Sequence, residues 1–227
     1  KSLVFLVLLL AGCATKQPQF SAGAVAADHH LASEAGVRIL LEGGNAVDSA
    51  IATSFTLSVV RPFSCGIGGG GFMLIDPKND SPIALNYRET APEIVDQNYY
   101  QNFSSRLGPY AVGVPGTVAG LLEAHKRYGR LPLAQVMAPA IEIAEHGFVL
   151  DDAYRSGVES ARNALSGVSR ELQTTAKALG RFGLHEKIVL NGQAEVLNQI
   201  AIHGRDGFYA GDVAKAIVAS TNGHITK

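Results

Sequence analysis

A run of glycines followed by an arginine–glutamate pair contains the residue types of this chain that are best suited to chemistry. Residues 64–73 have the sequence SCGIGGGGFM, and residues 86–92 have the sequence NYRETAP. Five of the six residues in 66–71 are glycine, so the backbone there can adopt positive φ and approach a ligand or another segment closely. Arginine, here Arg88, is the side chain best suited to holding a carboxylate through two parallel hydrogen bonds. The pattern therefore indicates a site for a small anionic substrate.

The same glycines also match the dinucleotide-binding pattern Gly-x-Gly-x-x-Gly. Gly66, Gly68 and Gly71 have this spacing, and Glu89 lies beyond them at the distance of a ribose ligand. That motif needs a strand before the glycines and a helix directly after them. Here a helical pattern precedes them and a strand-like run follows, so no helix N-terminus would face a pyrophosphate. We therefore expect a tight connection with close backbone packing rather than a nucleotide site.

Both stretches, together with motifs on either side, resemble the N-terminal part of gamma-glutamyltranspeptidases, also called gamma-glutamyltransferases or glutathione hydrolases. The resemblance extends from about residue 23 to the last residue. The other motifs that carry it are LASEAG at 31–36, GGNAVD at 43–48, VGVPGTVAG at 112–120, PAI at 139–141 and GFYAG at 207–211. Because these motifs occur in the family's order and spacing, the resemblance is specific.

The resemblance implies a role for Arg88. In this family the arginine of the Arg-Glu-Thr-Ala-Pro motif clamps the α-carboxylate of the gamma-glutamyl substrate, and Arg88 occupies that position. Glu89 would orient the loop rather than touch substrate. From the residues alone, the two side chains could equally form an exposed ion pair that contributes little energy.

The family's chemistry is that of N-terminal-nucleophile enzymes. The precursor cuts itself, and the newly exposed threonine of the small subunit attacks the gamma-glutamyl amide with its own α-amino group as base. We expect no catalytic residue within this chain, because neither Thr226 nor the pair at 174–175 has cleavage-site surroundings. The chain would then be inactive alone, and a C-terminal small subunit would complete the site for glutathione or a related substrate.

The resemblance implies no cofactor and no metal. The seven histidines show no ligand spacing such as His-x-x-x-His. Cys65 could act as a nucleophile only as a thiolate, which needs a base or a positive charge nearby, and no histidine is close in sequence. Family members often carry a serine at this position, so we expect Cys65 to be a small buried residue.

Residues 1–12 have the pattern of a bacterial lipoprotein signal peptide. A lysine precedes an apolar run that is too short to span a bilayer. The sequence LAGC at 10–13 resembles the lipoprotein cleavage and lipidation site, so Cys13 would be acylated, and 13–22 would form a polar tether. The alternative is an ordinary signal peptide with a chance cysteine. We expect a membrane-anchored protein on the extracytoplasmic (periplasmic) side of the bacterial cell envelope.

Composition excludes some classes of function. The formal net charge is −1 over 227 residues and no basic cluster is present, so nothing favours a nucleic-acid partner. Only two cysteines occur, Cys13 and Cys65, and they predict no disulfide framework. The length allows one sizeable core and one or two domains.

The elements that must position Arg88 follow from local patterns. Residues 72–76 and 83–87 are strand-like and flank a turn, which predicts a hairpin that ends at Arg88. Asn45 can cap a helix over 46–60, which carries no charge after its first turn and should be buried on all sides.

Further elements are expected on both sides of these. A short buried strand is predicted at 23–27, and Ser33 is the candidate N-cap of a helix that runs to Glu42. Additional helices are predicted at 117–128, 134–146, 151–165, 169–179, 189–203 and 212–221.

This order of elements fits a layered mixed fold of the α/β (α+β) class better than a helical bundle. The resemblance implies the αββα sandwich of N-terminal-nucleophile hydrolases, of which residues 23–227 would give one helical layer and part of the sheets. Two other functions stay open. A related acylase, such as a cephalosporin or glutaryl acylase, or a polyglutamate-processing transpeptidase would keep the scaffold. A truncated, non-catalytic lipoprotein would only bind a ligand or a partner.

Overall fold

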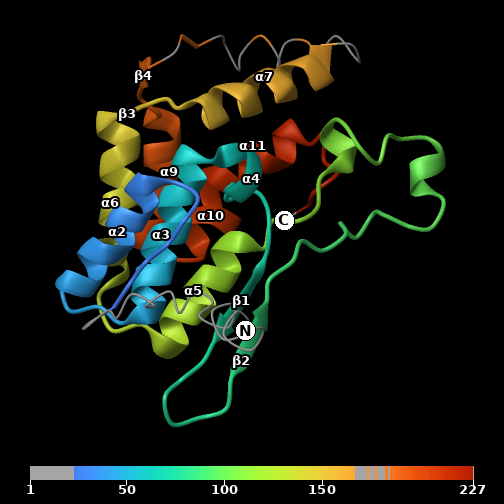
Figure 1. Cartoon of the computed structure of the whole chain (residues 1–227). Helices are drawn as coiled ribbons and strands as arrows, with labels where there is room; N and C mark the ends of the chain where they lie inside the picture. The colour runs from blue at the N-terminus through green and yellow to red at the C-terminus, as the bar shows by residue number, and fades with distance from the viewer. Residues whose placement is uncertain (1–22, 167–172, 174–176, 178–181, 184, 227) are drawn as a thin grey trace, which may run out of the picture.

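The computed structural model describes residues 23–166, 173, 177, 182–183 and 185–226. These residues are mostly helical, with two short antiparallel strand pairs, β1–β2 and β3–β4 (Figure 1). In this part of the chain no helix combines the length and the apolar character that a membrane crossing needs. The elements are α2 (His30–Leu41), α3 (Ala46–Val60), α4 (Pro62–Cys65), β1 (Phe72–Ile75), β2 (Ile83–Asn86), η1 (Tyr99–Gln101), η2 (Pro109–Ala111), α5 (Thr117–Tyr128), α6 (Leu133–His146), β3 (Phe148–Val149), α7 (Asp152–Ser166), β4 (Lys187–Ile188), α9 (Asn191–His203), α10 (Asp206–Tyr209) and α11 (Gly211–Ser220).

Helix α3 lies at the centre of the helical body, where it packs against α2, α5 and α6 (Figure 1). Ile51, Phe55 and Val59 are fully buried, and so are side chains on its other faces. The prediction of a helix covered on all sides is therefore confirmed. Burial of so many apolar side chains is the main source of free energy that holds this layer together.

The first turn of α3 is capped by Asn45, as predicted, and Asp48 makes this cap reciprocal. Asn45 Oδ1 accepts hydrogen bonds from the backbone N–H groups of Val47 and Asp48, at 2.9 and 3.0 Å. The Asp48 carboxylate in turn accepts from the Asn45 N–H at 2.9 Å, which completes a capping box. Asp48 is fully buried and also accepts from the Arg130 N–H at 3.1 and 3.0 Å. The cap thereby fixes the connection between α5 and α6 to the start of α3.

The end of α3 is held by a buried arginine, Arg61. The Arg61 guanidinium donates to both oxygens of Asp151, at 3.1 and 2.5 Å, and to Asp28 at 3.2 Å. It also donates to the Val60 carbonyl at 3.0 Å. These bonds tie the N-terminal segment and the start of α7 to the point where the chain turns toward the glycines.

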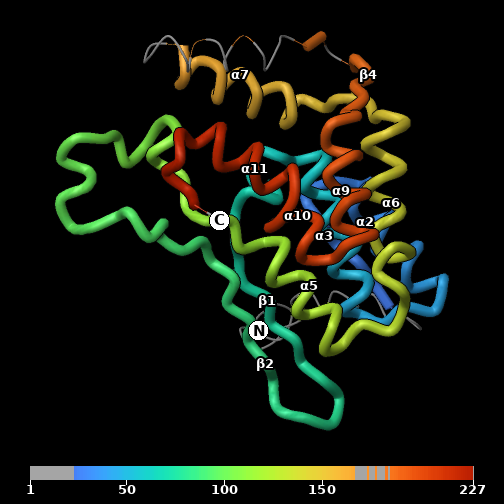
Figure 2. Tube along the Cα trace, turned by 180° about the vertical axis from the view of Figure 1, so that it is seen from behind, coloured from blue at the N-terminus to red at the C-terminus, as the bar shows by residue number. Residues whose placement is uncertain are grey.

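The β1–β2 hairpin projects from the helical body beside α5 (Figures 1 and 2). Its register pairs Phe72 with Asn86 and Ile75 with Ile83, which confirms the predicted hairpin. Alternate side chains behave differently: Met73 packs against the core, whereas Phe72 and Leu74 are 69% and 75% exposed. One face of the hairpin is thus covered by the described residues, and the other presents apolar side chains outward.

Two predictions near the N-terminus are wrong. Residues 23–27 form no strand, because no segment among the described residues pairs with their backbone. The next helix starts at His30, four residues earlier than the expected cap would allow, and His29 is its N-cap through a bond from the Leu31 N–H to Nδ1 at 3.2 Å. Ser33 lies inside the helix and accepts from the Ala27 N–H at 3.0 Å.

The remaining helices agree with the prediction to within two residues at each end where they are described. The expected helix at 169–179 lies outside the described residues, apart from isolated positions. The leader at 1–12 and the tether at 13–22, with Cys13, also lie outside them.

Candidate functional site

The glycine turn over 66–71 lies between α4 and β1, so a helix precedes it and a strand follows it, as predicted. No helix starts at these glycines, which rules out the dinucleotide geometry. None of them has a positive φ, so the freedom of glycine serves close backbone approach here, as expected, and not left-handed backbone. The carbonyl of Gly69 instead accepts from the N–H groups of Gly116 and Thr117, at 2.8 and 2.9 Å. The turn therefore caps the N-terminus of α5 with a backbone oxygen, since no side chain does so.

Close packing explains why glycines surround the segment that carries Arg88. A Cβ on Gly70 would lie 2.6 Å from the Tyr87 carbonyl oxygen, and one on Gly113 would lie 2.8 Å from Glu89 Cβ. A Cβ on Gly116 or Gly120 would collide directly with Tyr87. These glycines come from the turn, from the segment before α5 and from α5 itself. They allow three parts of the chain to approach one backbone segment, which holds it in place.

Arg88 is the second residue after β2, and its backbone N–H donates to Asn86 Oδ1 at 3.0 Å. The side chain is 59% exposed, and its Nε lies 3.2 Å from Glu89 Oε2. The Glu89 side chain is less exposed, and that oxygen is buried without a well-aligned hydrogen bond, so the ion pair is a contact between charges. The terminal nitrogens of Arg88 have no partner among the described residues.

The chain after Arg88 is anchored on its return path. Thr90 and Val114 form a backbone bridge, with the Val114 N–H donating to the Thr90 carbonyl at 2.9 Å. Farther out, the buried His224 contacts the Tyr99 hydroxyl at 2.8 Å and the Val112 carbonyl at 3.1 Å. The long excursion between β2 and α5, which extends away from the helical body in Figure 2, is thus fixed at both ends.

A cleft of about 500 Å³ is lined by Arg88, Glu89, Tyr87 and the turn from Ser64 to Gly70. We call it the glycine cleft. The structure thus brings together the two stretches that the sequence singled out, although Arg88 is 17 positions after Gly71. Helices α3 and α5 line the cleft with Ser54, Leu57, Thr117 and Leu121, while Arg88 supplies its positive charge.

Cys65 also lines the glycine cleft and is half-buried, so the expectation of a buried residue is only partly correct. Its Sγ lies 3.6 Å from Ser64 Oγ, and no histidine lines the cleft. A thiolate would therefore lack a base at this place. In the described part of the chain, no three His, Cys, Asp or Glu side chains are grouped as a metal site.

A second cleft, of about 470 Å³, lies on the other side of the same segment. Its walls include Arg88, Arg127, Arg205 and Tyr209. We call it the arginine cleft. Arg88 lines both clefts, so its side chain stands on the wall between them.

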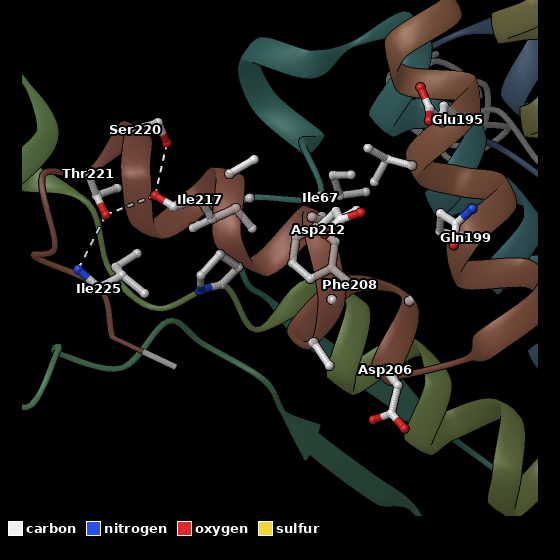
Figure 3. A pocket seen from close by; sticks show the side chains of 18 of the residues that line it. Ile67, Glu195, Gln199, Asp206, Phe208, Asp212, Ile217, Ser220, Thr221 and Ile225 are labelled. Atoms are coloured by element: carbon white, nitrogen blue, oxygen red, sulfur yellow. Dashed lines mark hydrogen bonds between the residues drawn. The ribbon is translucent and has the colours of Figure 1, made fainter.

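A third and larger cleft, of about 1130 Å³, lies between α9, α10 and α11. Figure 3 shows Glu195 and Gln199 of α9 across from Ile67, Phe208 and Asp212. Its charged side chains are acidic, apart from a histidine, and the rest of its lining is largely apolar. It adjoins the glycine turn but contains no residue that the sequence marked as a substrate ligand.

Tyr209 is a residue whose importance the sequence analysis missed, although the GFYAG motif contains it. Its hydroxyl donates to the Pro115 carbonyl at 2.8 Å and accepts from the Ala119 N–H at 3.1 Å. Burial raises the pKa of the Tyr209 phenol, so it stays a neutral donor. The Arg205 guanidinium lies 4.5 Å from the centre of its ring. Tyr209 therefore joins α10 to the N-terminus of α5, next to the glycine turn.

The fold is shared with gamma-glutamyltranspeptidases and related acylases. The crystal structure of gamma-glutamyltranspeptidase from Pseudomonas nitroreducens, complexed with L-DON, matches 92% of this chain with a TM-score of 0.84 and 36% identity, over 64% of its own length. Cephalosporin acylase from Bacillus halodurans matches 95% of this chain with a TM-score of 0.77 and 29% identity, over 44% of its own length. The predicted fold class is confirmed by these neighbours.

The gamma-glutamyltranspeptidase family model matches residues 32–227, and the chain belongs to this family. A glutathione hydrolase proenzyme from Pseudomonas aeruginosa is 38% identical over 204 residues, which cover 87% of this chain. The match covers 36% of that relative, so the chain spans about a third of its length. The resemblance that the motifs indicated is confirmed.

Proposed function

We propose that this chain is the N-terminal part of a gamma-glutamyltransferase, or glutathione hydrolase, which cleaves the gamma-glutamyl amide of glutathione and related compounds. The observation that carries the proposal is the placement of Arg88 beside the glycine turn, in a chain whose family match spans residues 32–227. The protein that would carry this chain together with the C-terminal part is called the complete protein below.

The proposed role of Arg88 is to bind the α-carboxylate of the gamma-glutamyl group. Arg88 lines two clefts, and a guanidinium can hold a carboxylate through two parallel bonds. Glu89 touches Nε and so restrains the side chain without occupying the terminal nitrogens. The glycines around Tyr87 support this role, because they fix the backbone on which the arginine stands.

The bond-making residue is proposed to lie in the C-terminal part. A threonine hydroxyl there would attack the gamma-carbonyl, the amide C–N bond would break, and the amine would leave with the proton taken from the hydroxyl. Water or the amine of an amino acid or peptide would then release the acyl group. On this proposal the present chain holds the substrate and is inactive alone.

The proposal extends to partners and location. The C-terminal small subunit would be the protein partner, and a lipid on Cys13 would anchor the protein to the envelope membrane after removal of residues 1–12. Support for the anchor is the residue pattern before and after Cys13. Metabolic labelling with a fatty acid tests it, because labelling should disappear in Cys13→Ser and persist in Cys65→Ser.

The test of the proposed activity compares three chromogenic anilides on the complete protein. One carries a gamma-glutamyl group, the second carries a 4-aminobutanoyl group, which lacks only the α-carboxylate, and the third carries a glutaryl group, which lacks only the α-amino group. If Arg88 binds the carboxylate, the gamma-glutamyl anilide should have a kcat/KM about 10- to 150-fold higher than the 4-aminobutanoyl anilide, which corresponds to one or two bonds to a charged group.

Equal rates on the gamma-glutamyl and 4-aminobutanoyl anilides would contradict the role proposed for Arg88. A preference for the glutaryl anilide over the gamma-glutamyl anilide would contradict the proposed activity and favour the acylase function, which the match to the Bacillus halodurans enzyme keeps as the alternative. Absence of self-cleavage and of turnover on all three substrates would favour the non-catalytic lipoprotein.

A further inference from the structure

We infer that the arginine cleft is a separate binding site for a small oxyanion with two or more negative charges, such as a phosphate or a tricarboxylate. The site lies on the side of Arg88 away from the glycine cleft. Its distinguishing residues are Arg127 and Arg205, which are absent from the glycine cleft.

The charge of the lining is the first observation. Three guanidinium groups, those of Arg88, Arg127 and Arg205, line the arginine cleft, and Glu123 is the single carboxylate among its lining residues. The large cleft beyond the glycine turn has the opposite charge and is lined by neither arginine nor lysine. A concave surface with one sign of charge attracts ions of the other sign.

The second observation is that these guanidinium groups are not used up by contacts within the chain. Arg127 is paired with Glu123, but its Nε and Nη2 both approach the same oxygen, Oε1. Arg88 engages Glu89 through Nε alone. Arg205 forms no ion pair with any carboxylate in the described part of the chain. Donors therefore remain on each group for a ligand.

The third observation is that Arg205 is held in position before a ligand arrives. Its guanidinium lies over the ring of Tyr209, a geometry that attracts a cation to an aromatic face. The ring cannot swing away, because the Tyr209 hydroxyl is bound to the Pro115 carbonyl and to the Ala119 N–H. Such pre-organisation lowers the entropy that binding would cost.

The size of the cleft limits the ligand. At about 470 Å³ the space is at the small end of ligand sites, and it opens between the end of β2 and the exposed side of α5. An anion that two or three arginines bind there needs several oxygens, arranged in a plane or a tetrahedron, that accept hydrogen bonds from several N–H groups. Phosphate and citrate both meet this requirement, whereas a single carboxylate meets it poorly.

Calorimetry on the complete protein tests the inference. Inorganic phosphate, citrate and acetate are titrated in turn at 0.15 M sodium chloride, where weak surface attraction is screened. We expect phosphate or citrate to bind and acetate not to bind. Whichever of phosphate and citrate binds with the higher affinity identifies the ligand class. Arg205→Gln should weaken binding about tenfold, as expected for the loss of one charged contact.

Arg155→Gln is the matched control. Arg155 is an exposed arginine on α7 that pairs with Asp152 at 3.2 Å and lies outside the cleft. This variant should bind with wild-type affinity. Circular dichroism on both variants shows whether each is folded.

Glu123→Gln tests whether the affinity for the anion follows the charge of the cleft, because a damaged fold could only lower that affinity. It removes the carboxylate from the cleft and releases Arg127, so affinity should rise about twofold to fivefold. The inference is overturned if wild type binds neither phosphate nor citrate at millimolar concentration. It is also overturned if Arg205→Gln keeps the affinity of Arg155→Gln, or if Glu123→Gln binds more weakly than wild type.

Discussion

Helix α3 and the β1–β2 hairpin are both apolar, but they are buried to different extents. Side chains of α3 such as Phe55 are covered on every side by neighbouring helices. On the hairpin, Phe72 and Leu74 stay exposed while the alternate residues pack inward. The helical body thus satisfies its own packing, whereas the hairpin presents an apolar face next to Arg88. Substitutions in the first region should act on stability, and those around the second should act on substrate binding.

The largest expected effect separates the two regions directly. Phe55→Ala removes a fully buried ring from α3 and should lower the free energy of unfolding by about 3–5 kcal/mol, because it leaves a cavity. Phe72→Ala removes an exposed ring from β1 and should change it by less than about 0.5 kcal/mol. Urea unfolding of both variants measures the difference. Equal losses would mean that the hairpin face is as well covered as the helix.

The ion pairs of the helical body provide the next test. Arg61→Ala should cost about 3 kcal/mol, because it removes a buried group that holds Asp28 and Asp151. Arg38→Ala breaks an exposed pair with Glu142 and should cost at most about 1 kcal/mol. Thermal or urea unfolding compares them, and a larger loss for Arg38→Ala would contradict the assigned roles.

Substitution of the glycines around Arg88 should lower the free energy of unfolding less than the changes above and should clearly weaken substrate binding. Gly116→Ala places a methyl group against the Tyr87 carbonyl, so the segment must shift at a cost of about 1–3 kcal/mol. The KM for the gamma-glutamyl substrate should rise with it. Gly68→Ala is the control, since a Cβ there meets no atom within 4 Å. If both variants keep the wild-type KM, the glycines do not position Arg88.

The smallest expected effect is a pH dependence of the free energy of unfolding that arises from His29, in the cluster around Arg61. Burial, and then the charge of Arg61, lowers the pKa of His29 below its usual 6.5. A group whose pKa is lowered in the folded state stabilises the fold above the unfolded pKa, and that stability is lost as pH falls. The free energy of unfolding should therefore decrease as the pH falls below about 6.5.

His29→Asn tests this prediction, because asparagine keeps an acceptor for the helix N-terminus but does not titrate between pH 5 and 7. Part of the loss of stability between pH 7 and 5 should disappear in this variant. Asp151 gives a separate decrease at more acidic pH: partial burial alone would raise its pKa, but the Arg61 and Tyr154 hydrogen bonds lower it overall. An identical pH profile for wild type and His29→Asn would contradict the role given to His29.

How much the sequence could predict depends on whether a signal is local. The Asn45 cap of α3 and the β1–β2 hairpin follow from short-range chemistry, and both were predicted correctly. The capping box with Asp48 and the strand register were not predicted. The N-cap of α2 was missed, because histidine is an uncommon cap and Ser33 offered a more usual one. The strand expected at 23–27 failed because a strand needs a partner, which composition does not supply.

The same limit applies to the site. The sequence correctly marked the glycine turn and Arg88, which meet in one cleft. It also indicated close backbone packing at the glycines, and they do serve the close approach of three segments, although none of those in the turn has a positive φ. The contacts of Arg61 and Tyr209 link residues that are about 90 positions apart, and no local pattern indicates such contacts.

Steady-state kinetics of Arg88 variants in the complete protein tests most directly whether this arginine holds the substrate carboxylate. Arg88→Gln should self-cleave like wild type but lose about 10- to 150-fold in kcat/KM for a gamma-glutamyl anilide, with most of the loss in KM. Arg88→Lys should recover only part of this, because an ammonium cannot form two parallel bonds. Unchanged KM and kcat/KM in Arg88→Gln would contradict the assignment and remove Arg88 from the substrate site.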